Sequence, residues 1–380
     1  MFDSTGLAAP NPVLGVAIFA LGGLAGAVFY LPLNKVKRWA WESYWLVYAV
    51  FGLLLVPWAL ALTTSPNVLS VLRAAPTREL TYCFLCGAMW GVGGLTWGLM
   101  LRYLGVGLGL SIGCGLCAAA GTLIPPILAG HPEQLYQSLA AKVSLASVAF
   151  SILGIVLVGM AGMSKENELP EEIKKKAVAE YNFKKGILVA IFSGLMSSAM
   201  NFGLHGGAKI ENLAHTVAPA TAPIWCWVPV LVVVLAGGFA VNLLWCLFLN
   251  AKNRTFGDYT RSNAPLIANI FLAGLAGGLW CSQFICLKTG EPAMGETAYI
   301  GFAVLMASVI LFSAMLGLLL GEWQRTSRRT RGLLALGLLL LAVSAGIAGY
   351  SGYCKTKTTS ETPAVAVRAS VSATFSRTSP

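Results

Sequence analysis

The sequence has 380 residues, of which 57% are hydrophobic and 11% are charged, and its mean hydropathy is +0.73. Soluble domains typically carry about 25% charged residues, so this composition excludes a soluble globular enzyme. The formal net charge is +11, and the loop pattern described below relates that charge to membrane topology and not to nucleic-acid binding.

Long stretches without charged residues recur along the whole chain. A helix needs about 20 mostly apolar residues to cross a bilayer. Ten stretches meet this length, at residues 13–33, 43–63, 80–101, 104–129, 143–161, 186–204, 222–249, 266–287, 297–320 and 332–353. We therefore predict an all-α membrane protein with ten transmembrane helices. The N-terminal segment before the first stretch has no Lys or Arg, unlike a cleaved signal peptide, so we expect the first helix to remain.

Basic residues are concentrated in alternate loops. Loops 34–42, 102–103, 162–185, 250–265 and 321–331 hold 17 of the 26 Lys and Arg residues, the opposite loops hold five and the C-terminal tail holds four. By the positive-inside rule the first set of loops is cytoplasmic. The topology predicted from this pattern has both termini outside.

Ten helices divide into two sets of five. An odd number in each half means that the halves enter the membrane from opposite sides, as in the inverted-topology repeats of many secondary transporters. We expect the first repeat at residues 1–161, a cytoplasmic linker loop at 162–185 and the second repeat at 186–353. Residues 354–380 are rich in Ser and Thr, and we expect this tail to be disordered.

Small residues follow helical spacing in the third stretch, where Gly87, Gly91, Gly94 and Gly98 lie on one face. This pattern favours close helix packing, and sliding during gating is the functional alternative. The pairs Cys83-x-x-Cys86 and Cys114-x-x-Cys117 are better explained by packing than by a metal site, because neither has a loop or a His beside it. We predict no metal and no cofactor.

Enzymatic motifs are absent from the sequence, and no predicted span contains a carboxylate. We therefore predict that the protein is not an enzyme. The sixth stretch carries a polar stripe at helical spacing, formed by Gly194, Ser198, Asn201, His205 and Lys209. Ser and Asn in membrane helices also form hydrogen bonds to neighbouring helices, so helix packing is the alternative to ligand binding for Ser198 and Asn201. His205 and Lys209 lie near the outer end of the span, so the alternative for them is a solvated position at the membrane surface, which we call the lip.

Aromatic residues supply the second candidate feature. Trp90 and Trp97 lie two turns apart in the third stretch, and Trp280, Gln283 and Phe284 share a face of the eighth. An indole ring offers a flat apolar face and one N–H donor, which suits an uncharged polyol, although packing against lipid or core also explains these residues. Four other tryptophans lie beside basic residues and are predicted to be interface anchors: Trp39, Trp41, Trp45 and Trp323.

Several segments of the first half resemble those of a known family. Phe29-Tyr-Leu-Pro-Leu-Asn-Lys-Val-Lys-Arg-Trp-Ala-Trp-Glu42, Gly87-Ala-Met-Trp-Gly91, Leu101-Arg-Tyr-Leu-Gly105 and Gly121-Thr-Leu-Ile-Pro125 are similar to signature segments of the bacterial L-rhamnose/proton symporters. That family belongs to the drug/metabolite transporter superfamily of ten-helix inverted repeats. The second half matches more loosely, through Ala208-Lys209 and Trp280-x-x-Gln283-Phe284.

The resemblance implies a proton-coupled permease of the bacterial inner membrane that imports L-rhamnose or a related deoxy-sugar by alternating access. The partners it implies are a small-molecule sugar, a proton and the lipid bilayer, with no nucleic acid, and it leaves the oligomeric state open. A metabolite exporter or exchanger of the same superfamily and a non-transporting sensor or scaffold are the alternatives. The sugar-site residues we predict are Trp90, Trp97, Asn201, Lys209, Trp280 and Gln283.

The predicted spans contain no Asp or Glu that could carry the coupling proton. His205 lies on the polar stripe and has an unperturbed pKa of about 6.5, and Glu79 lies at the start of the third stretch. We hypothesise that one of these two residues exchanges the proton. The alternative is that both are solvated lip residues.

Overall fold

The structure, a computed structural model, describes residues 11–168, 183–260, 264–319, 321, 323–324 and 326–375, and every regular element in these residues is a helix. The first part of the chain forms α1 (Pro12–Val28), α2 (Tyr30–Leu33), α3 (Trp41–Ala49), the π-helix η1 (Val50–Leu55), α4 (Val56–Thr64), α5 (Val68–Ala74), α6 (Thr77–Leu128), η2 (Pro132–Leu135) and α7 (Leu139–Asn167). The second part forms α9 (Phe183–His205), α10 (Ala208–Thr216), η3 (Pro223–Trp225), α11 (Val228–Asn253), η4 (Phe256–Tyr259), α12 (Leu266–Met294), η5 (Gly295–Ile300), α13 (Gly301–Leu319) and α14 (Arg328–Phe375).

Eight helical segments among the described residues are long and apolar enough to cross a membrane. They are Pro12–Leu33, Trp41–Thr64, Leu139–Lys165, Lys184–Thr216, Pro223–Asn253, Leu266–Met294, Thr297–Leu319 and Arg328–Ser351. The predicted all-helical membrane fold is therefore confirmed. The third and fourth predicted spans lie together in α6, which is not among these eight segments.

Helix α6 is bent back on itself. Gly113 packs against Trp97 and Met100, residues that lie more than three turns earlier in the sequence. A straight helix would separate Trp97 from Gly113 by about 24 Å, so the chain reverses direction between Met100 and Ile112. We call residues 77–100 the first arm of α6 and residues 112–128 its second arm.

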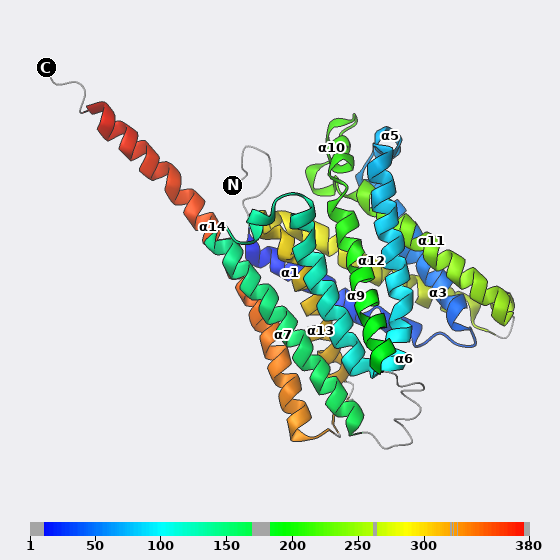
Figure 1. Cartoon of the computed structure of the whole chain (residues 1–380). Coiled ribbons are helices and arrows are strands. Elements are labelled where there is room, and N and C mark those ends of the chain that lie inside the picture. Colours follow the sequence, from blue (N-terminus) through cyan, green and yellow to red (C-terminus); the bar gives the residue numbers. More distant parts are fainter. Residues whose placement is uncertain are drawn as a thin grey trace.

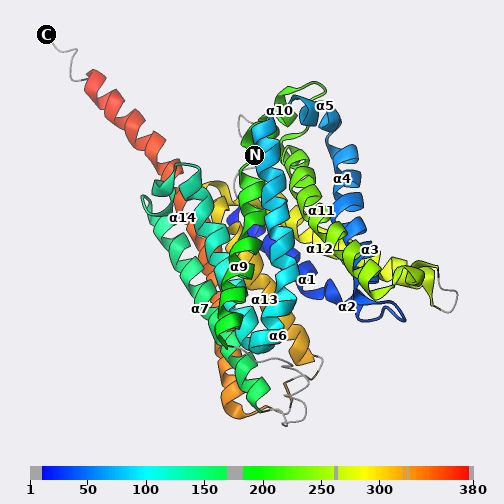
Figure 2. The same cartoon turned by 45° about the vertical axis from the view of Figure 1, so that its right-hand side comes forward.

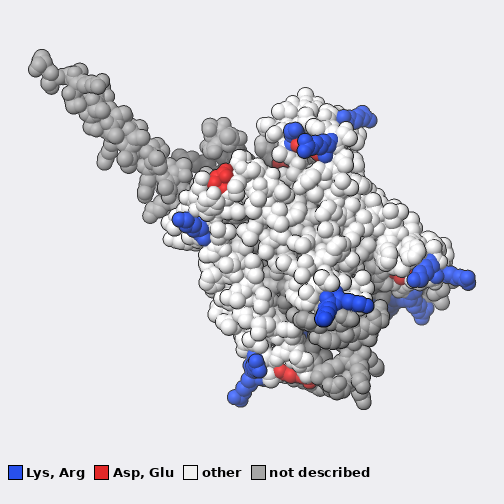
Figure 3. Space-filling model, in the orientation of Figure 1, with Lys and Arg blue, Asp and Glu red and all other residues white. Residues whose placement is uncertain are grey.

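The helices run between two ends of the molecule. In Figure 1 the loops after α2 and α11 lie at the right and the start of α14 lies at the bottom, whereas α5 and α10 lie at the top. We call the right and bottom sides together the basic end, because the segments there are rich in Lys and Arg, and we call the top the opposite end. In both views α9 lies beside α6 and α14 lies beside α7 (Figure 2). Figure 3 shows the charged side chains at the rims of the molecule, with a broad uncharged surface between them.

Close helix crossings occur at glycines. A Cβ atom at Gly87 would overlap the carbonyl oxygen of Val234, and one at Gly237 would overlap that of Phe84. At another crossing, a Cβ at Gly52 would lie 2.8 Å from the carbonyl oxygen of Gly277. Contacts of this kind require a hydrogen atom in place of a side chain, and they bring the first arm of α6 onto α11 and η1 onto α12.

The glycines of the third stretch do not all share one role. Gly87 and Gly91 pack on α11, whereas Gly94 has no atom within 4 Å of the place where a Cβ would be. The predicted single packing face is therefore correct for the first two and wrong for Gly94. The surroundings of Gly98 are outside the part of the chain that the structure describes.

A π-helical turn interrupts the second span. Pro57 has no N–H group, and its ring disfavours a regular helix in the preceding turn. The N–H of Val56 instead donates to the carbonyl of Phe51, five residues earlier. The widened turn begins two residues after Tyr48 and contains Gly52, so it lies directly at the crossing with α12.

Some helices continue well past their predicted spans, whereas α9 ends within one residue of its predicted end. Helix α12 continues to Met294, two turns beyond the predicted end at residue 287, and carries Lys288 and Glu291 within the helix. Helix α9 ends at His205, and a new helix, α10, begins at Ala208 after Gly206 and Gly207. Helix α14 continues to Phe375, past the predicted end at residue 353.

We expect Gly87→Ala to destabilise the protein, because the added methyl group must separate α6 from α11; overpacking of this kind costs roughly 1–3 kcal/mol. Thermal unfolding in detergent should show a lower midpoint. Gly94→Ala is the matched control on the same helix, and removal of a mid-helix glycine there should be neutral or stabilising by about 0.5–1 kcal/mol. Equal midpoints for the two variants would contradict this account of the crossing.

Candidate functional site

An aromatic cluster lies at the centre of the molecule. The rings of Trp90 and Trp280 are stacked with their centroids 4.9 Å apart, and Phe284 lies 4.9 Å from Trp280. Tyr48 meets Trp280 edge-on at 6.3 Å, and Trp45 lies 4.6 Å from Tyr48. The cluster thus joins the first part of the second span to the middle of the first arm of α6 and the middle of α12.

The glycine crossings position the tryptophan pair. Trp90 lies three residues after Gly87, and Trp280 lies three residues after Gly277. Gly238 of α11 leaves space for the indole of Trp90, because a Cβ there would lie 2.6 Å from that ring. Each indole is therefore placed one turn beyond a point where two backbones touch.

Polar groups border the aromatic cluster. The indole N–H of Trp45 donates to Oδ1 of Asn242 at 2.9 Å, and Asn242 is buried in α11. Gln283 donates from Nε2 to the carbonyl of Trp280 at 2.9 Å, and its Oε1 lies against Gly26 of α1. Amide groups at the edge of an aromatic surface can bind hydroxyl groups.

Four tryptophans were predicted to be interface anchors, and the structure corrects part of this. Trp39 and Trp323 are buried, and the Lys165 ammonium lies 4.7 Å from the Trp323 ring. Trp45 packs into the aromatic cluster. Trp41 alone among them has neither a buried side chain nor a hydrogen bond in the described residues, although it stacks on Trp45 at 5.0 Å.

Trp97 and Asn201 lie at a different contact, between α6 and α9. Trp97 donates from Nε1 to Oγ of Ser197 at 2.8 Å. Asn201 donates from Nδ2 to the carbonyl of Gly121 on the second arm, while its buried Oδ1 has no hydrogen-bond partner among the described residues. Buried acceptors usually have a donor, so this atom has the capacity to accept one more hydrogen bond.

The predicted polar stripe is interrupted. Gly194 packs on Gly113, and the hydroxyl of Ser198 bonds to Leu195 of its own helix, so these two residues serve packing. Because α9 ends at His205, Lys209 is not on the same helix; it lies exposed on α10 at the opposite end. Of the predicted sugar-site residues, the structure brings together Trp90, Trp280 and Gln283.

Charged side chains meet at the opposite end of the molecule, and we call Lys288, Glu291, Glu211 and His205 the charged cluster. The ammonium of Lys288 lies 2.5 Å from Oε2 of Glu291 and 3.8 Å from Oε1 of Glu211. His205 Nε2 lies 3.9 Å from Oε1 of Glu291. The Lys288 side chain is only 8% exposed. Glu79, the other predicted proton residue, has a buried Oε2 without a hydrogen-bond partner among the described residues.

Two polar networks fasten the second span to α11 and its flanking loops. At the basic end, Asp258 accepts hydrogen bonds from the Ala40 N–H at 2.7 Å and from the Ser43 hydroxyl at 2.9 Å. At the opposite end, Thr221 donates to Oδ1 of Asn67 at 2.7 Å, and Asn67 donates to the carbonyl of Val217. The second span is thus attached to the second half of the chain at both ends.

A further contact at the basic end joins α7 to α14. Glu168 accepts hydrogen bonds from the Ser327 hydroxyl at 2.6 Å and from the Thr330 hydroxyl. These bonds hold the pKa of Glu168 below its usual value. The last loop of the first half therefore contacts the start of α14 through hydrogen bonds to an ionised carboxylate.

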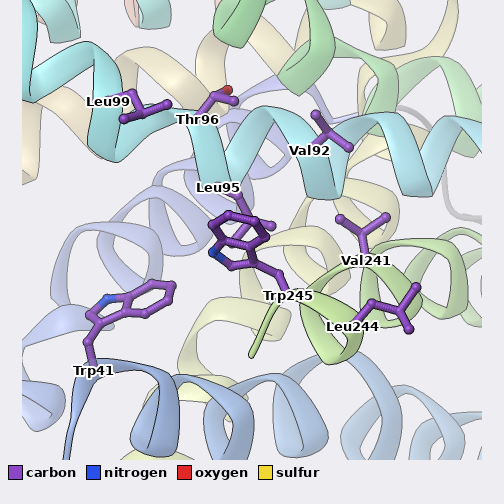
Figure 4. Close-up of a pocket in the computed structure, with 8 residues that line it drawn as sticks. All are labelled: Trp41, Val92, Leu95, Thr96, Leu99, Val241, Leu244 and Trp245. Carbon is purple, nitrogen blue, oxygen red and sulfur yellow. The ribbon is translucent and has the colours of Figure 1, made fainter. Parts of the chain in front are cut away.

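An apolar pocket of about 760 Å³ lies between α3, the first arm of α6 and α11. It is lined by Trp41, Val92, Leu95, Thr96, Leu99, Val241, Leu244 and Trp245 (Figure 4). Leu244 is 69% exposed, so the pocket opens on the outer surface of the helical body. Thr96 already bonds to Ser193, and the remaining lining is apolar or aromatic, which suits a hydrocarbon better than a polyol.

Three residues of the site were missed by sequence reasoning. Tyr48 and Asn242 lie in spans where no pattern distinguished them from packing residues, and Trp45 was predicted to be an interface anchor instead. Lys288 and Glu291 had a signal that was available: with Trp280 and Phe284 they continue the helical spacing of α12 along one face. They were not predicted to lie on this helix because the charge-free stretch ends at residue 287.

Comparison with known proteins identifies the family of this chain. The family described as L-rhamnose-proton symport protein (RhaT) matches residues 9–353. The L-rhamnose-proton symporter of Klebsiella pneumoniae (strain 342) is 32% identical over 340 residues, covering 88% of this chain and 97% of the relative. The symporter of Escherichia coli (strain ATCC 8739) is 31% identical over the same coverage. The chain therefore belongs to the L-rhamnose-proton symport protein family.

Proposed function

We propose that this protein is a secondary transporter that imports L-rhamnose together with protons. The observation that carries the proposal is the family match over residues 9–353, with relatives that align over 97% of their length. The all-helical membrane fold and the central aromatic cluster are consistent with a sugar permease. No feature of the described residues favours an exporter or a sensor over this function.

The transport arrangement we propose is a ten-helix 5+5 inverted repeat. The two arms of α6 added to the eight apolar segments make ten spans. Packing supports the equivalence of the halves: α1 packs on α12 and α13, and its counterpart α9 packs on the two arms of α6. The Gly-x-x-Trp pattern occurs at Gly87 to Trp90 and at Gly277 to Trp280, and each glycine makes a backbone crossing.

The proposed repeats are residues 1–161 and 186–353, joined by a cytoplasmic linker loop at 162–185, with 354–380 as the tail. Residues 169–182 of the linker lie outside the described residues. We place the basic end in the cytoplasm of a bacterial inner membrane and both termini outside, because the alternate loops that the sequence pattern assigns to that side hold 17 of the 26 Lys and Arg residues. Alternating access then requires the two halves to move about the central aromatic cluster.

The topology can be tested with thiol labelling of intact cells. A membrane-impermeant maleimide should label Cys354 from outside, because the other eight cysteines are buried or partly buried. In a Cys354→Ser background, Ala177→Cys should be labelled only after permeabilisation. Labelling of the Ala177→Cys variant in intact cells would reverse the orientation.

For the sugar we propose a site between the halves that is centred on Trp90, Trp280 and Gln283. In this proposal the site extends to Trp97 and Asn201 at the separate contact between α6 and α9, with Lys209 on α10 at its outer entrance. Tyr48 and Asn242 complete its lining. The stacked tryptophans supply an apolar platform, and the free Oδ1 of Asn201 supplies a hydrogen-bond acceptor. Because Trp90 and Trp280 cover one another in this state, the sugar must contact their edges or part them.

Asn201→Ala and Gln283→Ala should each weaken L-rhamnose binding. Losing one buried hydrogen bond costs about 1–3 kcal/mol, which corresponds to a rise in Kd of about 5- to 150-fold. Ser198→Ala is the matched control, since its hydroxyl is satisfied by its own helix. Binding to purified protein measures the effect, and an unchanged Kd in both variants would move the site elsewhere.

The coupling proton requires a titratable group, and we propose that His205 or Glu79 exchanges the proton with the external medium. Their support is position: His205 lies beside Glu291, and Glu79 has an unpartnered carboxylate oxygen. Both lie at the end that faces the external medium in the proposed topology.

Transport itself is tested by uptake of radiolabelled sugars in cells that express the full chain. L-Rhamnose should accumulate, other deoxy-sugars should enter more slowly, and a proton uncoupler should abolish accumulation. Glucose serves as the control sugar. Rhamnose accumulation that persists in the uncoupler would contradict proton coupling, and absence of any rhamnose uptake would contradict the substrate.

A further inference from the structure

The charged cluster contains an uncompensated charge. Lys288 contributes one positive charge, while Glu211 and Glu291 contribute two negative charges when both are ionised. The side chains of Lys288 and Glu291 are only 8% and 13% exposed. An excess charge in such a poorly hydrated environment is unfavourable, and binding of one proton would make the three groups neutral together.

The elements around this trio offer few other charges. From α9, His205 faces Glu291 at 3.9 Å, and from the first arm of α6, Glu79 and Cys83 lie on the same side, with Cys83 close enough to interact with Glu211. Helices α1 and α13, which pack on α12, have no charged residue. Other charged or titratable residues of the nearby segments include Arg73, Arg78, Lys209 and His215, which are exposed at the surface of α5, α6 and α10, and Cys226, which lies near Glu211. Glu296 follows on η5, and its side chain lies outside the described part of the chain.

Access to the cluster is asymmetric. The Glu211 side chain is 33% exposed on the short helix α10, whereas Glu291 is more deeply buried on α12. Lys288 contacts both carboxylates and bridges them. A proton from the external medium can therefore reach Glu211 first, and the shared lysine allows the charge change to affect Glu291.

One helix connects this cluster to the aromatic site. Trp280, Phe284 and Glu291 are spaced by four and seven residues, so they lie on one face of α12, and Lys288 lies at its edge. The separation between Trp280 and Glu291 along the helix is about 16 Å. A change in the charge of the cluster therefore acts on the same rigid helix that carries half of the tryptophan pair.

We propose that the Lys288–Glu291–Glu211 trio is the site at which the coupling proton binds, with Lys288 as its fixed counter-ion. This inference rests on the proposed function and assigns the binding of its proton to the trio, with His205 beside Glu291 as a group that exchanges the proton with the medium. One O–H bond forms on a carboxylate oxygen of Glu211 or Glu291 when the trio is open to the outside, and the same bond breaks when the proton is released inside. The neutral trio no longer holds Lys288 in its two-carboxylate contact, and α12 is free to move.

The test uses the full chain in proteoliposomes and two assays. Counterflow measures exchange of L-rhamnose without a proton gradient, and accumulation is driven by an inward gradient of one pH unit. One proton per sugar sustains about tenfold accumulation under that gradient. The wild type should perform both, and a wild type that does not exchange L-rhamnose contradicts the proposed function without bearing on the trio.

Glu291→Gln and Glu211→Gln should retain counterflow while accumulation falls from about tenfold to about onefold. The double variant Lys288→Gln with Glu291→Gln removes a buried charge pair together, so it answers the question if a lone Lys288 prevents folding of Glu291→Gln. Glu133→Gln is the control, because among the described residues Glu133 pairs only with His131, at the surface beside η2, and it should leave both assays unchanged.

Accumulation at the wild-type level in both single variants would overturn the proposal. Loss of counterflow in all three variants would also overturn it, because the trio would then be structural. If the control Glu133→Gln also lost accumulation while it retained counterflow, the effect would not be specific to the trio. That result would count against the proposal.

Discussion

Backbone contact at glycine is the interaction on which the rest of the structure depends. In a bilayer the helices gain little from hydrophobic association with one another, so close van der Waals packing has to hold them. The crossings at Gly87 and Gly277 bring two helices of one half of the chain onto two of the other. Because a tryptophan follows each glycine by one turn, the same contacts that hold the halves together also stack Trp90 on Trp280.

The polar groups around this centre form two sets: one anchors the second span, and the other lies on α12, the helix that we propose moves. The second span is tied at both ends, through Asp258 and Asn67, to the loops that flank α11. Helix α12, by contrast, carries Trp280 near its middle and the Lys288–Glu291 ion pair near its end. A proton that changes the charge at one end of this rigid helix can therefore alter the position of the aromatic cluster by moving the helix. Coupling of this kind requires no titratable group beside the sugar.

Much of the fold follows from the sequence, because a bilayer span is defined by a long uncharged stretch and needs no tertiary information. The spans at 13–33 and 43–63 agree with the helices to within about two residues. The pairing of Trp90 with Trp280 was within reach, since both were selected as site residues. The ion pair of Lys288 and Glu291 could have been found from the helical spacing after Phe284, but a charge-free criterion ends a span at its first charged residue even when the helix continues. Lys209 was placed on the stripe of Asn201 for the converse reason, since the break at Gly206 and Gly207 leaves hydropathy unchanged.

The central claim is that L-rhamnose and protons cross the membrane together through this chain. It is tested most directly by recording the external pH of a lightly buffered suspension of wild-type proteoliposomes when L-rhamnose is added without any imposed gradient. The account predicts alkalinisation of the medium that accompanies sugar entry, and no such signal with glucose or in vesicles without protein. Entry of L-rhamnose with no change in external pH would contradict it.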